Sequence, residues 1–169
     1  PCGTLFPYTT LFRSGVVALT QQAKSHFSPG IRRITKVIEN PIILPTDGSQ
    51  GRDDQWKNGR KAIVSIGRLA WQKRFDRLID AYALIAAKSP GWDLHLFGDG
   101  DLRSELQNRV ESLDVRDRIF FHGRISSPWP ILANTDLFVM ASDTEGFPMA
   151  LIEAMAAGIP VVSTDCPTG

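Results

Sequence analysis

The stretch that decides the fold is AIVSIGRLAWQKRFDRLIDAYALIAAKSPGWDLHLFG, residues 62–98. Its first part, 62–67, is an apolar run that predicts a buried strand, and the apolar spacing over 74–88 predicts a helix. Ser89-Pro90-Gly91 ends that helix, because proline and glycine do not continue it. A second apolar run over 92–98 predicts another strand. The strand–helix–strand order predicts two parallel strands joined by a right-handed crossover.

The same alternation continues toward the C-terminus. We expect strands over 118–123, 136–142 and 160–164, helices over 101–113 and 149–157, and a short helix or turn over 127–135. Gly158 is the expected residue just after the last helix. Strands that are apolar along nearly their whole length indicate burial on both faces. The sequence therefore predicts the α/β class, with a Rossmann-like parallel sheet and helices on both of its faces.

Upstream of residue 61 the pattern is shorter. A strand is expected over 16–20, a helix over 21–27 stopped by Ser28-Pro29-Gly30, and a second strand over 34–42. Residues 45–60 are polar, contain glycine and show no period, which predicts a linker or loop. One strand and one helix are too little for a domain, and the chain stops at TDCPTG, after a strand. We therefore expect a fragment of a longer protein.

The composition excludes several classes of function. With 169 residues the chain has the length of about one domain, and its hydrophobic content of 43% and charged content of 22% are ordinary for a globular protein. A net charge of +1 gives no indication of nucleic-acid binding. No apolar run has membrane-spanning length. Cys2 and Cys166 make no disulfide framework or metal-binding spacing, which favours a cytoplasmic location.

The first 14 residues, PCGTLFPYTTLFRS, have neither a helical nor an alternating period. Residues 4–14 match the translation of a common sequencing-adapter oligonucleotide. We interpret residues 1–14 as an artefact that does not belong to the fold. Cys166 is then the only genuine cysteine.

The candidate chemistry lies where the strands end, because ligands of open parallel sheets bind at the carboxyl ends of the strands. After the strand over 136–142, Pro148 suits the first helical position, since it needs no N–H there. The N–H groups of Met149 and Ala150 are then free at a positive helix end, which predicts a phosphate site. Gly146 allows a ligand to approach the backbone.

Two glutamates flank that helix start. Glu145 lies in the loop, and Glu153 lies inside a helix with almost no other polar residue. A carboxylate in such surroundings needs donors, and a ribose diol offers two. The alternative is that Glu153 makes a local structural hydrogen bond and Glu145 is solvated.

Two cations follow the first strand of the deciding stretch. Arg68 and Lys73 come after Gly67, so both can reach the same crevice at the strand ends. Together they would clamp a diphosphate, with the arginine binding two oxygens at once. The alternative is that both are surface cations near the start of a helix.

Other strand ends carry weaker signals. Gly98 and Gly100 resemble part of a dinucleotide-binding loop, but Arg103 occupies the place of the third glycine, so NAD binding is poorly supported. His122 precedes Gly123 at a strand end, where a structural histidine is the favoured interpretation.

A metal site is not expected. Asp143 and Asp165 are the candidate carboxylates, and nothing near them in the sequence completes a ligand set.

Taken together, GRL…QK, FGDGDLRSEL, FFHG and above all EGFPMALIEAMAAGIPVVST resemble the retaining GT-B glycosyltransferases of family 4. The resemblance runs from about Val16 to Gly169 and implies a truncated C-terminal half of a GT-B fold. It implies that 15–44 ends an N-terminal acceptor domain and crosses to the next, and that 61–169 is the nucleotide-sugar-binding domain. TDCPTG and EGFPM are similar to bacterial members that build lipid-linked oligosaccharides or exopolysaccharides, often from UDP-sugars.

The resemblance also implies roles for single residues. Arg68 and Lys73 match the pair that neutralises the donor diphosphate, Glu145 the glutamate facing the donor sugar, and Glu153 the one holding the ribose hydroxyls. Arg124 matches the wall beside the base. The family usually has glycine where this chain has Arg74, a change expected to leave the clamp intact. The remaining expected donor contacts are Gly67, Gly98, Gly123, Gly146, Phe147, Met149 and Ala150.

The resemblance therefore implies a metal-independent glycosyltransferase of polysaccharide biosynthesis that needs no cofactor besides its nucleotide-sugar donor. The expected acceptor is a glycan or a lipid-linked glycan, and membrane contact is expected to be peripheral, at the inner face, through the missing N-terminal domain. The fragment alone is expected to turn over essentially nothing. The alternatives are a GT-B-like sugar-nucleotide epimerase, a phosphorylase, and a nucleotide-binding or non-functional fragment.

Overall fold

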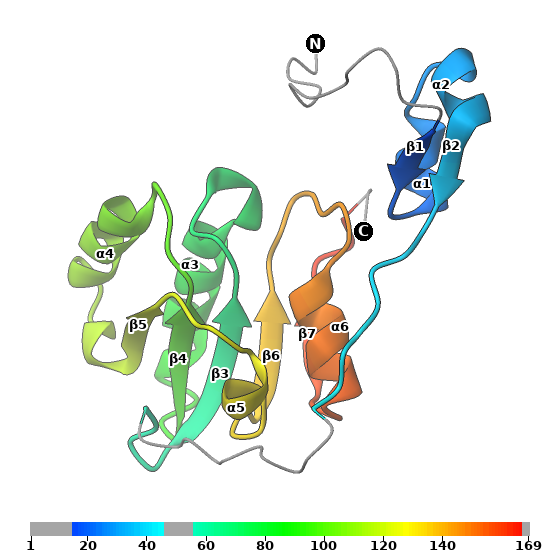
Figure 1. Ribbon diagram of the computed structural model, residues 1–169. Helices are drawn as coiled ribbons and strands as arrows, with labels where there is room; N and C mark the ends of the chain where they lie inside the picture. The colour runs from blue at the N-terminus through cyan, green and yellow to red at the C-terminus, as the bar shows by residue number, and fades with distance from the viewer. Residues whose placement is uncertain (1–14, 46–55, 167–169) are drawn as a thin grey trace.

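The computed structural model describes residues 15–45 and 56–166 (Figure 1). The interpretation of residues 1–14 as an artefact lies outside the described residues, and so do residues 46–55 of the expected linker.

The main body is one parallel sheet of five strands in the order β5-β4-β3-β6-β7. The strands are β3 (Lys61–Ile66), β4 (Trp92–Phe97), β5 (Ile119–Gly123), β6 (Leu137–Met140) and β7 (Val161–Ser163). All five were expected from the apolar runs, and the α/β class is confirmed. The central strands β3 and β4 are buried along nearly their whole length, as two-sided burial requires.

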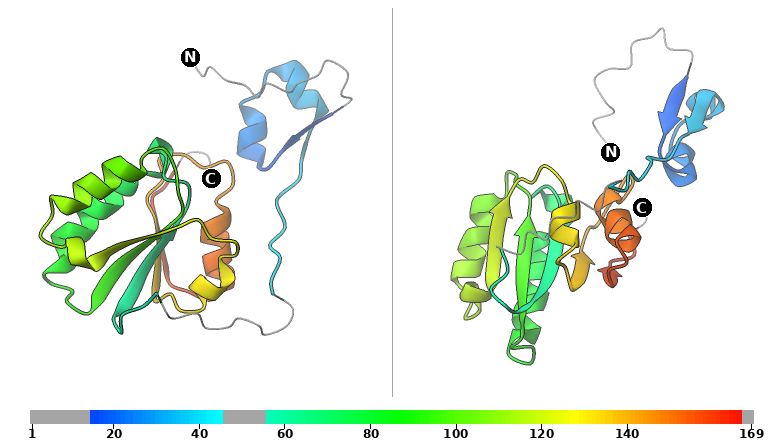
Figure 2. Two further views of the ribbon diagram at one scale, coloured as in Figure 1. Left: turned by 60° about the vertical axis from the view of Figure 1, so that its left-hand side comes forward. Right: turned by 60° about the horizontal axis from the view of Figure 1, so that its bottom comes forward.

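Helices cover both faces of the sheet, as Figure 2 shows. Side chains of α3 (Phe75–Ala86) and α4 (Arg103–Glu111) form one apolar cluster with the sheet. Side chains of α5 (Trp129–Leu132) and α6 (Met149–Ala156) belong to a separate cluster. Gly158 follows α6 with a φ of 75°, the left-handed conformation expected of a residue that ends a helix.

The strand order contains a switch point between β3 and β6. From β3 the chain builds β4 and then β5 on one side, and it returns to place β6 and β7 on the other side. Loops that leave β3 and β6 therefore diverge at their carboxyl ends and leave a crevice between them. Ligands of open α/β sheets bind in that crevice.

A smaller unit precedes the sheet. Its parallel strands β1 (Val16–Ala18) and β2 (Thr35–Val37) pair with each other and not with the main sheet, and α1 (Gln21–Ser25) and α2 (Pro29–Ile34) connect them (Figure 1). The expected strand over 34–42 is too long, and α2 was not expected at all. Pro29 cannot continue α1, but it can start α2, because the first helical position needs no N–H.

The described end of the expected linker is bonded to the sheet. The Nζ of Lys57 donates to Oδ2 of Asp136 at 2.8 Å, before β6. The Nδ2 of Asn58 donates to the buried Asp93 of β4 at 2.6 Å. Residues 57 and 58 therefore brace the amino-terminal ends of the strands, opposite the crevice.

Candidate functional site

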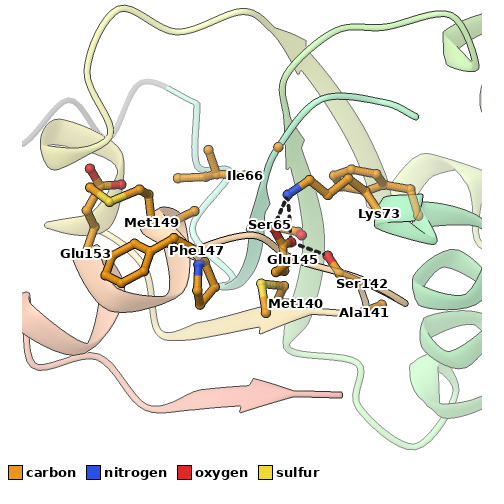
Figure 3. A pocket seen from close by; sticks show the side chains of 14 residues that line it. Ser65, Ile66, Lys73, Met140, Ala141, Ser142, Glu145, Phe147, Met149 and Glu153 are labelled. Carbon is orange, nitrogen blue, oxygen red and sulfur yellow. Dashed lines mark hydrogen bonds and ion pairs between the residues drawn. The ribbon is translucent and has the colours of Figure 1, made fainter. Parts of the chain in front are cut away.

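The crevice at the switch point holds a hollow of about 250 Å³, which we call the first hollow (Figure 3). Its walls are the end of β3, the end of β6 with the loop after it, and the first turns of α6. Seven of its lining residues were expected site residues, and six of them are Gly67, Lys73, Glu145, Phe147, Met149 and Ala150. Glu153 lines it as well.

Lys73 and Glu145 are bonded to each other at one end of the first hollow (Figure 3). The Nζ of Lys73 lies 2.6 Å from Oε1 and 2.8 Å from Oε2 of the carboxylate. Lys73 ends a short 3-10 helix, η1 (Trp71–Lys73), and Glu145 lies in the loop after β6. Glu145 is only 8% exposed, so its charge depends on these bonds in place of water.

Hydroxyl groups that the sequence analysis did not single out fix this glutamate. The Oγ of Ser142 donates to Oε1 of Glu145 at 2.6 Å. Thr164, just after β7, donates its own hydroxyl to the carbonyl of Ser142 at 2.6 Å. Thr164 directly follows β7 and Ser142 lies two residues after β6, and this position just past a strand was a usable signal for finding them.

Glu153 lies at the other end of the first hollow, away from Lys73 (Figure 3). Within the described residues its carboxylate has no hydrogen-bond partner. Burial raises the pKa of Glu153 above its usual range. The alternative of a local structural hydrogen bond has no such bond among the described residues, and the expected need of Glu153 for ligand donors stays a prediction.

The start of α6 differs in detail from the expectation. Pro148 stands just before the helix and not at its first position, and the N–H of Met149 donates to the carbonyl of Phe147 at 2.8 Å. The sequence analysis predicted a free amide at Met149, and this prediction is wrong. The amides of Ala150 and Leu151 find no backbone acceptor among the described residues. They remain at a positive helix end that lines the hollow and can bind an anion.

A second hollow of about 420 Å³ adjoins the first and shares Ile66 and Gly67 with it. It contains Arg68, Arg124 and the carboxylates of Asp99 and Asp101. Arg68 donates to Oδ2 of Asp101 at 3.0 Å, and both side chains are largely exposed. The two expected clamp cations therefore face neighbouring hollows, and each is paired with a carboxylate.

The G-x-G sequence after β4 serves backbone packing. A Cβ on Gly98, whose φ is 136°, would lie 1.8 Å from the carbonyl oxygen of Gly67. A Cβ on Gly100 would lie 2.4 Å from the carbonyl oxygen of Leu69. Only glycine allows the loop after β4 to approach the loop after β3 so closely. Gly98 also lines the second hollow.

Two other expected site residues are next to lining residues in the chain but do not line the hollows themselves. Gly123 and Gly146 line neither of them. His122 pairs with the buried His95: the Nε2 of His122 lies 3.0 Å from the Nδ1 of His95. This contact agrees with a structural histidine. In the described part of the chain no three His, Cys, Asp or Glu side chains are grouped closely enough to hold a metal ion.

Known proteins that are similar to this chain are glycosyltransferases. The family model described as "Glycosyl transferases group 1" matches residues 49–169. An uncharacterized glycosyltransferase of Methanocaldococcus jannaschii is 30% identical over 97% of this chain and 43% of its own length. The lipopolysaccharide 1,6-galactosyltransferase of Salmonella typhimurium is 36% identical over 79% of this chain and 37% of its own length.

Solved structures agree with the sequence matches. The crystal structure of Anabaena HepE in complex with UDP-glucose superposes with a TM-score of 0.76 at 27% identity, covering 92% of this chain and 46% of that one. The fold matches those of GT-B glycosyltransferase structures. The chain spans less than half the length of the relatives it matches here.

Proposed function

Because this chain belongs to the family of group 1 glycosyl transferases, we propose that it carries the donor site of an enzyme that transfers a sugar from a UDP-sugar to a glycan or lipid-linked glycan. The solved relative with UDP-glucose bound supports a UDP-sugar as the donor. The galactosyltransferase relative, named for lipopolysaccharide, supports a glycan acceptor.

The observation that carries the proposal is the distribution of charge around the first hollow. Lys73 and Glu145 lie at one end, the carboxylate of Glu153, which has no partner among the described residues, lies at the other, and the start of α6 stands between them. A nucleoside diphosphate sugar offers a partner to each: diphosphate oxygens to the lysine and helix amides, and ribose hydroxyls to Glu153. The donor sugar then lies against Glu145.

The proposed mechanism is electrostatic. When the glycosidic bond breaks, negative charge builds on the departing diphosphate, and fixed positive groups stabilise it. Lys73, Arg68 and the first amides of α6 supply that positive charge from the protein itself, and we propose that the transfer needs no metal ion. The family 4 resemblance of EGFPMALIEAMAAGIPVVST supports retention of the anomeric configuration, which we include in the proposal.

Donor binding is tested by calorimetric titration of the folded chain with UDP, GDP and ADP. Glu153→Ala and Arg68→Ala should each weaken UDP binding, by up to about tenfold, because each removes a partner of the ligand. Glu105→Ala on α4 and Arg116→Ala, both at exposed positions that line neither hollow, are the matched controls. If all four variants changed UDP binding equally, the assignment of the donor site would be contradicted. A folded chain that binds no nucleotide would contradict it as well.

Membrane contact needs a separate test. No helix within residues 15–45 and 56–166 has the length and apolar character to cross a bilayer. We propose peripheral contact by the whole enzyme, at the cytoplasmic face, which liposome co-sedimentation of that enzyme tests; failure to sediment would contradict it.

A further inference from the structure

Arg74 has an unusual backbone. Its φ of 50° and ψ of 40° are left-handed, and among the described residues it is the one non-glycine residue with positive φ. An L side chain is strained in this region, whereas glycine is not. Arg74 stands between η1 and α3, directly after Lys73. A side chain that persists at a strained position close to a binding site indicates a contribution of that side chain.

The guanidinium of Arg74 joins two carboxylates. Its Nε and Nη2 donate to the two oxygens of Asp76, at 3.0 and 2.8 Å, at the start of α3. Its Nη1 donates to Oδ2 of Asp143 at 2.8 Å, in the loop after β6. The other oxygen of Asp143 accepts from Arg77 at 2.6 Å. The hydrogen bond from Arg74 holds the pKa of Asp143 below its usual range, so this carboxylate stays charged.

The bonds of Arg74 complete a row of contacts between two segments that are distant in sequence. Gln72 accepts the backbone N–H of Asp143 at 2.9 Å, Lys73 bonds Glu145, and Arg74 bonds Asp143. Three consecutive residues are thus each tied to the loop over 142–145. The middle tie is the pair that faces the first hollow.

Arg74 itself lines neither hollow, and Asp143 does not either. Its influence on a bound donor must therefore pass through Lys73 and Glu145. We propose that Arg74 is a positioning residue: by binding Asp143 it holds η1 against the loop over 142–145, so that Lys73 and Glu145 meet the donor in register. This inference rests on the proposed function of the same site.

The ion pair of Arg74 could instead serve stability alone, and Arg74→Gly separates the two roles. Glycine removes the guanidinium and also removes the backbone strain, so we expect the thermal midpoint to stay within about 4 °C of the unmodified chain. Arg109→Ala is the matched control, because it breaks a two-bond ion pair with Asp80 that joins α4 to α3 away from the hollows.

The first measurement is amide hydrogen exchange, which needs no ligand. In Arg74→Gly the N–H of Asp143 should exchange about tenfold faster or more, since the loop has lost one of its ties. Arg109→Ala should leave that exchange rate unchanged. An unchanged rate in Arg74→Gly would overturn the proposal, because the loop would then be held without the arginine.

The second measurement compares UDP with uridine, which lacks the diphosphate. Arg74→Gly should weaken UDP binding about tenfold and leave uridine binding unchanged, because Lys73 is expected to contact only the diphosphate. Arg74→Lys should not restore UDP binding, since one ammonium cannot reproduce the planar fork that joins both carboxylates. UDP binding equal to that of the unmodified chain would overturn the positioning role. An unmodified chain that binds neither ligand would contradict the proposed function, and the exchange of Asp143 would still decide the role of Arg74.

Discussion

Lys73 and Glu145 form an ion pair at one end of the first hollow, with Nζ 2.6 and 2.8 Å from the two carboxylate oxygens. A diphosphate that binds Lys73 must therefore compete with Glu145 for the same ammonium. This competition lowers the affinity for the diphosphate, but it also keeps the lysine in place before the donor arrives.

Glu145→Gln should for this reason strengthen the binding of UDP. The amide keeps the shape of the side chain but releases the ammonium, so we expect UDP affinity to rise about threefold to tenfold. UDP-glucose should gain less, because its sugar loses the carboxylate. Without ligand, the free energy of unfolding of Glu145→Gln should be about 1–3 kcal/mol lower than that of the unmodified chain, since the partly buried ammonium of Lys73 has lost its ion partner. Calorimetry with UDP and UDP-glucose measures these affinities, with Glu105→Gln as the control. If Glu145→Gln bound UDP as tightly as the unmodified chain or less tightly, the proposed competition for Lys73 would be contradicted.

Arg68 is held by Asp101 in a similar way but in a more exposed place. The two side chains are 66% and 83% exposed, and such ion pairs contribute only about 0–1 kcal/mol. Asp101→Asn should therefore raise UDP affinity by no more than about fivefold, and the gain should vanish at high salt. Asp80→Asn, which frees Arg109 far from the hollows, should have no effect on UDP binding. A loss of UDP affinity in Asp101→Asn would show that the aspartate itself serves the ligand.

Gly98 and Gly146, both expected as donor contacts, differ in the space around them. A Cβ on Gly98 would lie 1.8 Å from the carbonyl oxygen of Gly67, whereas a Cβ on Gly146 has no atom within 4 Å. Gly98→Ala should lower the free energy of unfolding by about 3 kcal/mol or more, because the loops after β3 and β4 must separate. Gly146→Ala should change it by less than about 1 kcal/mol. Urea denaturation of both variants measures the difference, and similar losses would contradict the packing role of Gly98.

These glycines also show which parts of the fold the sequence predicts. Apolar runs and helical spacing are local properties, so the five strands of the main sheet and the four helices around it could be located from the sequence. The need for glycine at position 98 could not be predicted from the sequence. It arises because the backbone of Gly67, at the end of another strand, lies close to Gly98. The G-x-G sequence looked like a weak nucleotide motif, and the structure shows a close approach of two loops.

The site follows the same division. The topology of a parallel sheet gathers the strand ends at one edge, so residues there could be named as candidates from the sequence, and their roles as donor contacts stay a prediction. Their pairing was not predictable: Lys73 and Glu145 are 72 residues apart, and no local pattern links them. The same holds for Arg74 and Asp143, which the sequence analysis treated separately. Where Pro29 starts α2, a local signal was present, but it was assigned only to the end of α1.

The pair formed by the buried His95 and the half-buried His122 predicts how stability depends on pH. His95 is 1% exposed, and its ring lies against Trp56 and Phe120. Burial first, and then the neighbouring His122, lower the pKa of His95 to about 4. Burial also lowers the pKa of His122. Both rings are therefore neutral in the folded chain over a pH range in which an unfolded chain takes up protons.

The direction of the effect follows from the proton count. In the unfolded chain a histidine has a pKa of about 6.5, so between about pH 6.5 and 4 the unfolded state binds more protons than the folded state. The contribution is thus fully present above about pH 7 and is lost as the pH falls through that window. For His95 alone the loss amounts to about 3 kcal/mol.

Urea denaturation between pH 7.5 and 4.5 measures this loss. His95→Gln keeps a hydrogen-bonding group beside His122 but does not titrate, so the free energy of unfolding should fall less steeply with decreasing pH than in the unmodified chain. The comparison uses the slopes and not the absolute stabilities, because the substitution itself costs stability. His26→Gln, on an exposed position after α1, is the control and should keep the original slope. Parallel pH profiles for His95→Gln and the unmodified chain would contradict the prediction, since the neutral histidine pair would then contribute nothing to acid sensitivity.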